Sequence, residues 1–407
     1  MTPSAAKPGQ VPLWVIVLAC AIIAGIGMGL RQVMGLYLKP VTELLGIGRE
    51  AFGLAMAIAN IVWGLAAPVV GAVSDKYGTG RVVVFGALCT AGGLVVMYTA
   101  TSDLELFVSG ILLGFGVAGA GVNAMVGAVG RAASPEQRTA AIAALGMGSG
   151  IGIFVALPYT HLLIEQLGWQ TSLLVLAGTA MVMLPLALPI KGKPAPRAAE
   201  KPQSLAEALR EAFRHPSFWL LNAGFFVCGF HVVFYGVHLP AYVADKGLGN
   251  EVAVIALTVV GMGNLLGTYL SGQSAKIIEK RIGLSLIYFG RSLVFLGFLF
   301  LPITGTTVIL LSGVLGLLWL STVPLTSGLV ATFFGPTWMT MLYGIVFFSH
   351  QVGSFLGVWL AGRLFDITRS YDAMWWISVA LGLFAALVHW PIKERPVARL
   401  AAPAVPA

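Results

Sequence analysis

The feature that most constrains this chain is an apolar run of about 20 residues that recurs along most of its length. A helix of that length crosses the hydrocarbon core of a bilayer, which is roughly 30 Å thick. Only 10% of the 407 residues are charged, whereas soluble domains carry about 25% charged residues. The sequence therefore predicts a polytopic membrane protein.

Polar residues, glycines and prolines divide the chain into separate spans. The 51 glycines suit membrane helices that pack backbone to backbone, as in GILLGFGVAGAG at 110–121. The predicted fold class is an all-α polytopic membrane protein of twelve transmembrane helices in two pseudo-symmetric halves of six. The twelve spans are predicted at 12–38, 50–72, 81–100, 104–127, 138–163, 168–190, 218–242, 252–273, 283–302, 306–331, 338–363 and 372–391.

A basic, proline-containing stretch separates the two halves. Within it, Ser204 followed by Glu207 fits a capping box, which predicts a short surface helix over 204–213. We expect four parts, namely an N-terminal half at 1–190, a cytoplasmic linker at 191–217, a C-terminal half at 218–392 and a cytoplasmic tail at 393–407.

Basic residues give the orientation. Most of the 24 lysines and arginines fall on one side if both termini are cytoplasmic, as the positive-inside rule requires for an even number of spans. We therefore interpret the net charge of +8 as topological, and expect a multi-pass protein of the inner (plasma) membrane that contacts lipid and binds no nucleic acid. We expect a monomer.

The three cysteines predict neither disulfides nor metal binding. Cys20, Cys89 and Cys228 lie singly in apolar segments, as core residues do. We expect no cofactor and no metal.

The two halves look related. GAVSDKYGTGR begins at Gly71 and GQSAKIIEKR at Gly272, about 200 residues apart, and each ends a predicted span. The same offset carries Arg31 close to His231. Duplicated halves place a transport site between them, near the bilayer midplane, so we expect Arg31 and His231 to face each other there.

The first of these loops resembles a motif of the major facilitator superfamily, Gly-x-x-x-Asp-Arg/Lys-x-Gly-x-Arg/Lys-Arg/Lys. Gly80 departs from it at one basic position, and the resemblance covers about residues 11 to 395. It implies the major facilitator fold and a conformational latch between the halves, although the same charges could instead be solvated and only topogenic. The residues that match the motif are Gly71, Asp75, Lys76, Gly78 and Arg81.

Two further segments, GLRQVMGLYLKPV and FFSHQVGSFLG, resemble the oxalate/formate antiporter and monocarboxylate transporter branch. The resemblance places Arg31 near a polar position that contacts substrate, and His350 near a cationic position of the oxalate carrier. Thr268 and Tyr269 stand where those relatives have an anion-pairing arginine. Carboxylate transport is what this resemblance implies.

Polar residues inside the spans are candidate substrate contacts, since charges retained in a membrane helix usually face a cavity or pathway. Arg31 is the only formally charged residue from Val11 to Leu38, and its alternative is to extend to the outer headgroups. His231 and Tyr235 are spaced i, i+4 and share a helix face with His238. Packing is the alternative for His231.

In the eleventh span His350 and Gln351 are expected to line the cavity. Asn123 is a candidate ligand group, or else a contact between helices. For Arg291 we expect a structural contact rather than a substrate contact. No Asp or Glu lies deep in a span, so His231 and His350 are the proton-coupling candidates.

These features predict a secondary active transporter that moves a small organic anion, a mono- or dicarboxylate, together with a proton by alternating access. An anion exchanger, or a drug or cation efflux antiporter, is the alternative. An efflux antiporter would be expected to carry an intramembrane carboxylate and a Gly-Pro motif in helix 5, which reads GMGSGIGIFVALP here. No nucleotide-binding loop or soluble catalytic domain is apparent, so we expect no enzyme. Substrate identity and the direction of transport stay open.

Overall fold

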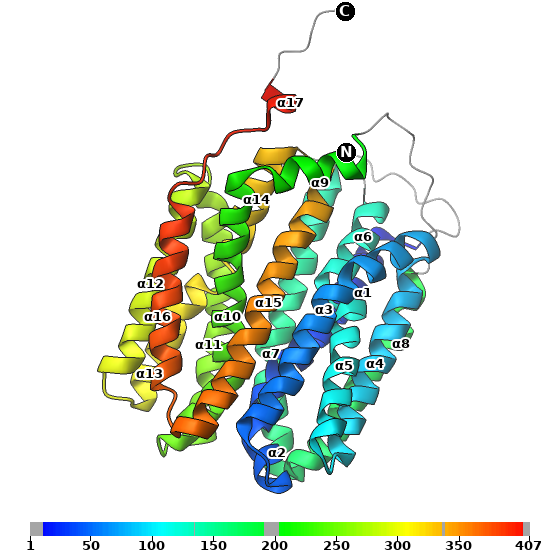
Figure 1. Cartoon of the computed structure of the whole chain (residues 1–407). Coiled ribbons are helices and arrows are strands. Elements are labelled where there is room, and N and C mark those ends of the chain that lie inside the picture. Colours follow the sequence, from blue (N-terminus) through cyan, green and yellow to red (C-terminus); the bar gives the residue numbers. More distant parts are fainter. Residues whose placement is uncertain (1–10, 134, 191–202, 336–337, 402–407) are drawn as a thin grey trace, which may run out of the picture. The chain divides into compact units, whose positions relative to one another are not determined.

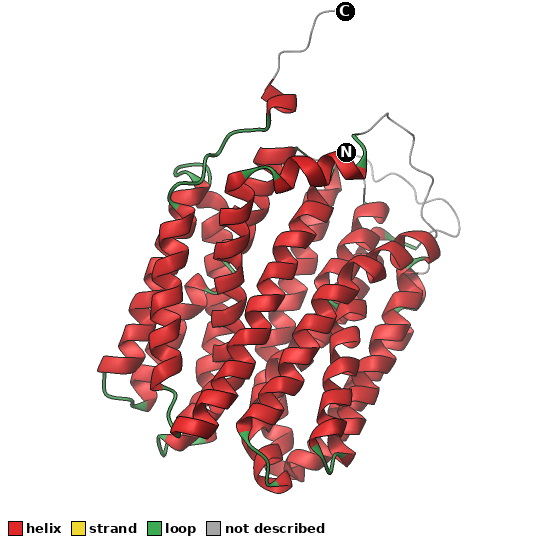
Figure 2. Cartoon of the chain, in the orientation of Figure 1, coloured by secondary structure: helices red, strands yellow, loops and turns green. Residues whose placement is uncertain are grey.

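The computed structural model describes residues 11–133, 135–190, 203–335 and 338–401. Nearly all of these residues are helical, and none of the described residues forms a strand (Figure 2). The chain divides into two compact units. Unit 1 lies within Met1–Met34 and Leu65–Pro196, and unit 2 within Gly35–Gly64 and Arg197–Ala407.

The described residues contain 11 helical stretches that are long and apolar enough to cross a membrane. The predicted number of spans is twelve, and the difference arises because one stretch, Ala144–Leu186, overlaps two predicted spans, 138–163 and 168–190. Its 43 residues would extend about 65 Å at 1.5 Å per residue, roughly twice the 30 Å needed for one crossing. Gly168 interrupts it with φ 77° and ψ 157°, a conformation that glycine adopts without a steric penalty. The all-α polytopic fold is confirmed.

Unit 1 contains six of the helices labelled in Figure 1 and part of a seventh, α3. Their backbones approach closely at small residues. A Cβ atom on Gly119 of α5 would stand 2.8 Å from the Gly86 Cα of α4, so the glycine run at 110–121 permits contact between two main chains, as the sequence predicts. The helices are α1 (Leu13–Gln32), α3 (Arg49–Tyr77), α4 (Thr79–Thr99), α5 (Asp103–Ala120), α6 (Val122–Ala132), α7 (Pro135–Met181) and α8 (Met183–Leu186), followed by the 3-10 turn η2 (Leu188–Ile190).

Unit 2 holds the first half of α3 and the helices from α9 onward. Within it α10 packs against α15 and α16, and α12 packs against α16 (Figure 1). Its elements are η1 (Val33–Tyr37, of which the first two residues belong to unit 1), α2 (Leu38–Leu45), α9 (Leu205–Phe213), α10 (Pro216–Asp245), α11 (Asn250–Ser274), α12 (Lys280–Phe300), α13 (Gly305–Leu318), α14 (Thr322–Phe334), α15 (Met339–Thr368), α16 (Asp372–His389) and α17 (Ala398–Ala401).

The predicted span at 306–331 is broken into α13 and α14. A broken helix inside a membrane needs internal partners for the backbone groups that the break frees. Arg291 of α12 donates to the carbonyl oxygens of Leu318 and Trp319. The Leu320 N–H donates to Asn264 Oδ1 of α11 at 3.0 Å. The break is therefore stabilised from two neighbouring helices.

The predicted surface helix over 204–213 is confirmed as α9. Ser204 N–H donates to Glu207 Oε2 at 2.8 Å, and Glu207 N–H donates to Ser204 Oγ at 3.3 Å, which completes the capping box. The Ser204 N–H holds the pKa of Glu207 below its ordinary value. Part of the predicted linker, residues 191–202, lies outside the described residues. The predicted domain boundaries stay a prediction, and Gly35–Gly64 belongs to unit 2 by its contacts.

Candidate functional site

Two predicted substrate contacts belong to unit 1. Arg31 lies in the last turn of α1 and is partly exposed. Asn123 lies in the first turn of α6, directly after the break at Gly121. His231 belongs to unit 2, so the predicted pairing of Arg31 with His231 stays a prediction.

The predicted latch lies at the turn between α3 and α4, also in unit 1. Gly78 caps α4 with φ 95°, and the hydroxyls of Ser74 and Thr79 hydrogen-bond across the turn at 2.8 Å. The Lys76 ammonium lies 5.2 Å from the centroid of the Tyr77 ring. Among the motif residues, Gly71, Asp75 and Lys76 end α3, and Arg81 stands in the first turn of α4. Their role as a latch stays a prediction.

His350 and Gln351 lie together in the middle of α15. Gln351 is fully buried and His350 is 6% exposed. His350 Nδ1 donates to Gln351 Oε1 at 3.0 Å, and Gln351 Nε2 donates to the Asn60 carbonyl of α3 at 3.2 Å. Phe347 stacks on the His350 ring with an interplanar angle of 9°. His350 and Gln351, which the sequence predicts as neighbours in the site, are therefore hydrogen-bonded to each other.

His231 and Tyr235 point to other neighbours. His231 Nε2 donates to the Ser378 carbonyl of α16 at 2.9 Å. The Tyr235 hydroxyl lies 2.6 Å from Ser312 Oγ of α13. Both side chains are buried against α12, α13 and α16, and no hydrogen bond between the described residues joins them to His350.

Arg291 is a charged residue within α12 of unit 2. It is fully buried, and its Nε and Nη2 donate to the Leu318 carbonyl at 3.1 and 2.7 Å. Nη2 also donates to the Trp319 carbonyl and lies 3.5 Å from the Cys228 sulfur. Nη1 has no hydrogen-bond partner within the described parts of the chain. The structural contact expected for Arg291 is present, and two of its N–H groups are left over.

Cys228 connects this arginine with the predicted site. Its sulfur lies 3.3 Å from Thr322 Oγ1 and within hydrogen-bonding reach of His350. Tyr288, whose ring centroid lies 5.2 Å from the Arg291 guanidinium carbon, also lies near the thiol, and its hydroxyl has no hydrogen-bond partner among the described residues. We call Cys228, Tyr288, Arg291, Thr322 and His350 the Arg291 cluster. Sequence reasoning treated Cys228 as a core residue and missed these contacts.

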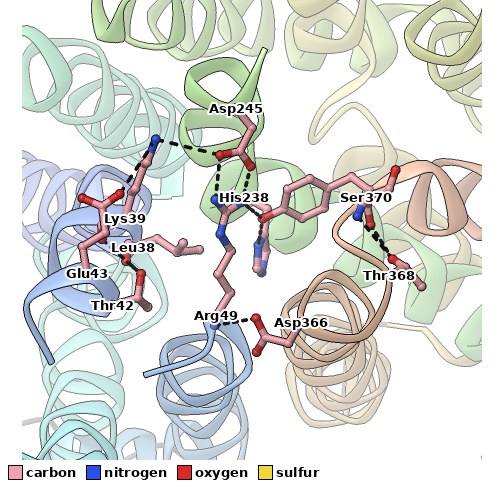
Figure 3. A network of polar contacts seen from close by, with 11 residues as sticks. Leu38, Lys39, Thr42, Glu43, Arg49, His238, Asp245, Asp366, Thr368 and Ser370 are labelled. Carbon is pink, nitrogen blue, oxygen red and sulfur yellow. Dashed lines mark hydrogen bonds and ion pairs between the residues drawn. The ribbon is translucent and has the colours of Figure 1, made fainter. Parts of the chain in front are cut away.

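A second polar cluster, the Arg49 cluster, joins the ends of four helices in unit 2 (Figure 3). The Arg49 guanidinium donates to both carboxylate oxygens of Asp245, at 2.5 and 2.7 Å, the bidentate geometry that arginine favours with carboxylates. Its Nη1 also donates to the Tyr371 hydroxyl at 2.9 Å. Asp366 accepts from the backbone N–H groups of Arg49 and Glu50 at 3.0 and 2.8 Å.

Tyr371 continues this cluster into the interior of unit 2. Burial raises the pKa of Tyr371, so the phenol keeps its proton and donates to His238 Nδ1 at 2.9 Å. His238 Nε2 donates to the Val358 carbonyl at 2.9 Å. This arrangement holds His238 at both ring nitrogens. Over the described ranges, no group of three or more His, Cys, Asp or Glu side chains is placed to hold a metal ion.

Comparison with known proteins gives one family. The sequence model of the Major Facilitator Superfamily matches residues 17–358. Monocarboxylate transporter 11 of Mus musculus is 28% identical, over 96% of this chain and 89% of its own length. An uncharacterised MFS-type transporter of Bacillus subtilis, YcxA, is 25% identical, over 95% of this chain and 97% of its own length.

Solved structures support the same fold. A bacterial homologue of the human lysosomal transporter Spinster, in an inward-facing and unoccupied conformation, superposes with a TM-score of 0.74 at 14% identity, over 96% of this chain and 99% of that one. A D-xylose-proton symporter superposes with a TM-score of 0.72 at 16% identity, over 95% and 99% of the two chains.

Proposed function

Since the chain belongs to the major facilitator superfamily, a family of transporters, we propose that it moves a small organic anion across the membrane by alternating access, in symport with a proton. Relatives named monocarboxylate transporters, at 24 to 28% identity, support a carboxylate as the anion. What we propose beyond the family is that the substrate is a carboxylate and that its transport is coupled to a proton.

The observation that carries the proposal is a buried cation in unit 2, Arg291, whose Nη1 has no hydrogen-bond partner among the described residues. Arg291 is fully buried, two of its N–H groups lack partners, and no carboxylate in the described parts of the chain contacts it. The 16 Asp and Glu residues lie near span ends or outside the predicted spans. An unpaired buried charge is costly, and a carboxylate substrate would supply the missing charge with the geometry that arginine prefers.

Four other residues stay proposed substrate contacts. Arg31 and Asn123 belong to unit 1, and His350 and Gln351 to unit 2. His231 and Tyr235 hydrogen-bond to Ser378 and Ser312, and we assign them to the packed wall behind the Arg291 cluster.

The proposed cycle includes the loop between α3 and α4 as a latch, with Asp75 as its acid. The proposed location is the plasma membrane with both termini in the cytoplasm. This orientation rests on the distribution of lysine and arginine, and the bacterial relative fits that location.

Counterflow in proteoliposomes tests the proposal. Liposomes loaded with unlabelled mono- or dicarboxylates are diluted into the labelled compound, with and without a pH gradient. We expect exchange of at least one carboxylate and its accumulation when the outside is acidic. Exchange of organic cations or drugs without any carboxylate would show that the protein is an antiporter of the alternative class.

A matched pair of arginine variants on α12 tests the site. Arg291→Gln removes the buried charge, and we expect at least a tenfold loss of carboxylate exchange, since a hydrogen bond to a charged group contributes about 1.5–3 kcal/mol. Arg281→Gln removes a charge at the end of the same helix, where it pairs with Glu279, and should leave exchange unchanged. Equal exchange by both variants would remove Arg291 from the site.

A further inference from the structure

The positive charge of Arg291 has a titratable neighbour that is neither histidine nor carboxylic acid. Cys228 Sγ lies 3.5 Å from Arg291 Nη2. The elements packed around the thiol contribute Tyr288 from α12, His350 and Tyr343 from α15, and the Thr322 hydroxyl from α14. His389 of α16 stacks on Tyr288 at 5.1 Å. None of these neighbours is an aspartate or a glutamate.

We propose that Cys228 carries the coupling proton, and that its thiolate and the substrate carboxylate alternate as the counter-ion of Arg291. This inference rests on the proposed function, because it names the coupling group of the same site. The orphaned Nη1 of Arg291, which is buried in the cluster, is a second donor that an incoming anion can occupy.

Charge balance produces the coupling. In the empty carrier the guanidinium pairs with the thiolate and the site is neutral. In the loaded carrier one proton has bound the sulfur, one carboxylate has bound the guanidinium, and the site is neutral again. Binding of the proton alone would leave a charge of +1, and binding of the anion alone a charge of −1. Because a net charge inside a membrane is costly, the two half-loaded states are disfavoured.

The neighbours of Cys228 suit both protonation states. Arginine stabilises an adjacent thiolate. When protonated, the thiol can donate to the Thr322 hydroxyl at 3.3 Å. His350, which also lies beside the thiol, donates through Nδ1 to Gln351.

The test is equilibrium binding of the labelled carboxylate that supports counterflow, measured as a function of pH. If one proton binds with each anion, the affinity of the wild type falls about tenfold per pH unit once the thiol has lost its proton. Cys228→Ser is nearly isosteric and cannot titrate in this range. We expect its affinity to be independent of pH and its accumulation in a pH gradient to be lost. Cys20→Ser and Cys89→Ser, at the two other buried cysteines, should behave as the wild type.

Cys228→Asp places another titratable acid at the same position. We expect it to restore the pH dependence, displaced to lower pH. Unfolding temperatures of all variants identify loss of folding, and the aspartate variant keeps the test decisive if the serine variant is unstable. A pH slope that persists in Cys228→Ser, or is absent from Cys228→Asp, overturns the inference. If the wild type exchanges no carboxylate in counterflow, the proposed function itself has failed. If the wild type exchanges carboxylates and Cys228→Ser has the same pH slope as the wild type, only the role of Cys228 has failed.

Discussion

Arg31 and Arg291 show how one residue type can serve two purposes inside a membrane. Arg291 uses Nε and Nη2 to hold the carbonyl groups freed by the break between α13 and α14, and keeps Nη1 unused. Arg31 lies in the last turn of α1, where a cation is favoured by the partial negative charge of the helix end. The two arginines therefore differ in role because of their positions. Arg31 lies at a helix end, whereas Arg291 lies within a helix and stabilises the break in a neighbouring span.

Replacing Arg31 tests whether this terminal cation also binds substrate. We expect Arg31→Ala to lower carboxylate affinity by about 10- to 100-fold, equivalent to about 1.5–3 kcal/mol for a charged hydrogen bond, and Arg31→Lys to weaken binding less. Affinity is read from competition in the counterflow assay. Lys276→Ala, which removes an exposed cation bonded to Gln273, is the control. Normal affinity in Arg31→Ala would restrict Arg31 to a structural role.

Much of the Arg291 cluster could not be predicted from the sequence. Arg291 stands out because it is the only charged residue inside the predicted span 283–302, and its structural contact was predicted. Cys228 carries no such signal, because a thiol in an apolar run resembles any small core residue. The contact between them depends on the rotation of α10 and α12 about their axes, and nearly uniform hydropathy around a buried helix leaves that rotation undetermined.

At the level of helices, hydropathy and punctuation predicted nearly every span, because length and apolarity are local properties of the chain. One departure is the break at 319–321, which depends on whether the freed backbone groups find partners in neighbouring helices. That information lies in Arg291 and Asn264 and not in the segment itself.

The contact between α10 and α15 yields a prediction for two glycines of one helix. A Cβ on Gly353 would overlap the Phe226 carbonyl of α10, whereas a Cβ on Gly344 would meet no atom within 4 Å. We expect Gly353→Ala to destabilise the protein by about 1–3 kcal/mol through overpacking. Gly344→Ala should be neutral or slightly stabilising, because alanine favours a helix over glycine by about 1 kcal/mol. Thermal unfolding in detergent measures both, and equal unfolding temperatures would contradict the tight contact.

For the whole molecule, the informative feature is that Gly35–Gly64 groups with the C-terminal residues in unit 2. The Arg49 cluster stabilises this grouping through partners that are 196 to 322 positions away in the chain. A single sequence gives no sign of such pairing, since Arg49, Asp245, Asp366 and Tyr371 each look like an ordinary polar residue at a span end. The membrane spans were predictable from local patterns, whereas these contacts between residues far apart in the chain were not.

Two ion pairs in this region differ in burial and allow a matched test. Arg49 and Asp245 have side chains 10% and 27% exposed, whereas those of Arg363 and Glu50 are 51% and 33% exposed. Breaking a buried pair costs about 3–5 kcal/mol and an exposed pair contributes about 0–1 kcal/mol. For the partly buried Arg49–Asp245 pair we expect a coupling energy of about 2 kcal/mol in a double-mutant cycle of Arg49→Gln and Asp245→Asn. The cycle of Arg363→Gln and Glu50→Gln should give less than about 1 kcal/mol.

The same variants connect the Arg49 cluster to transport. If the Arg49–Asp245 pair breaks in one state of the proposed alternating-access cycle, weakening it shifts the balance between the states. Arg49→Gln should therefore change the turnover of counterflow several-fold more than Arg363→Gln does. Carboxylate affinity should change little, because the cluster contains no proposed substrate contact. If the two double-mutant cycles give equal coupling energies and the variants Arg49→Gln and Arg363→Gln have equal turnover, the Arg49–Asp245 pair contributes no more than the exposed pair and has no role in the cycle.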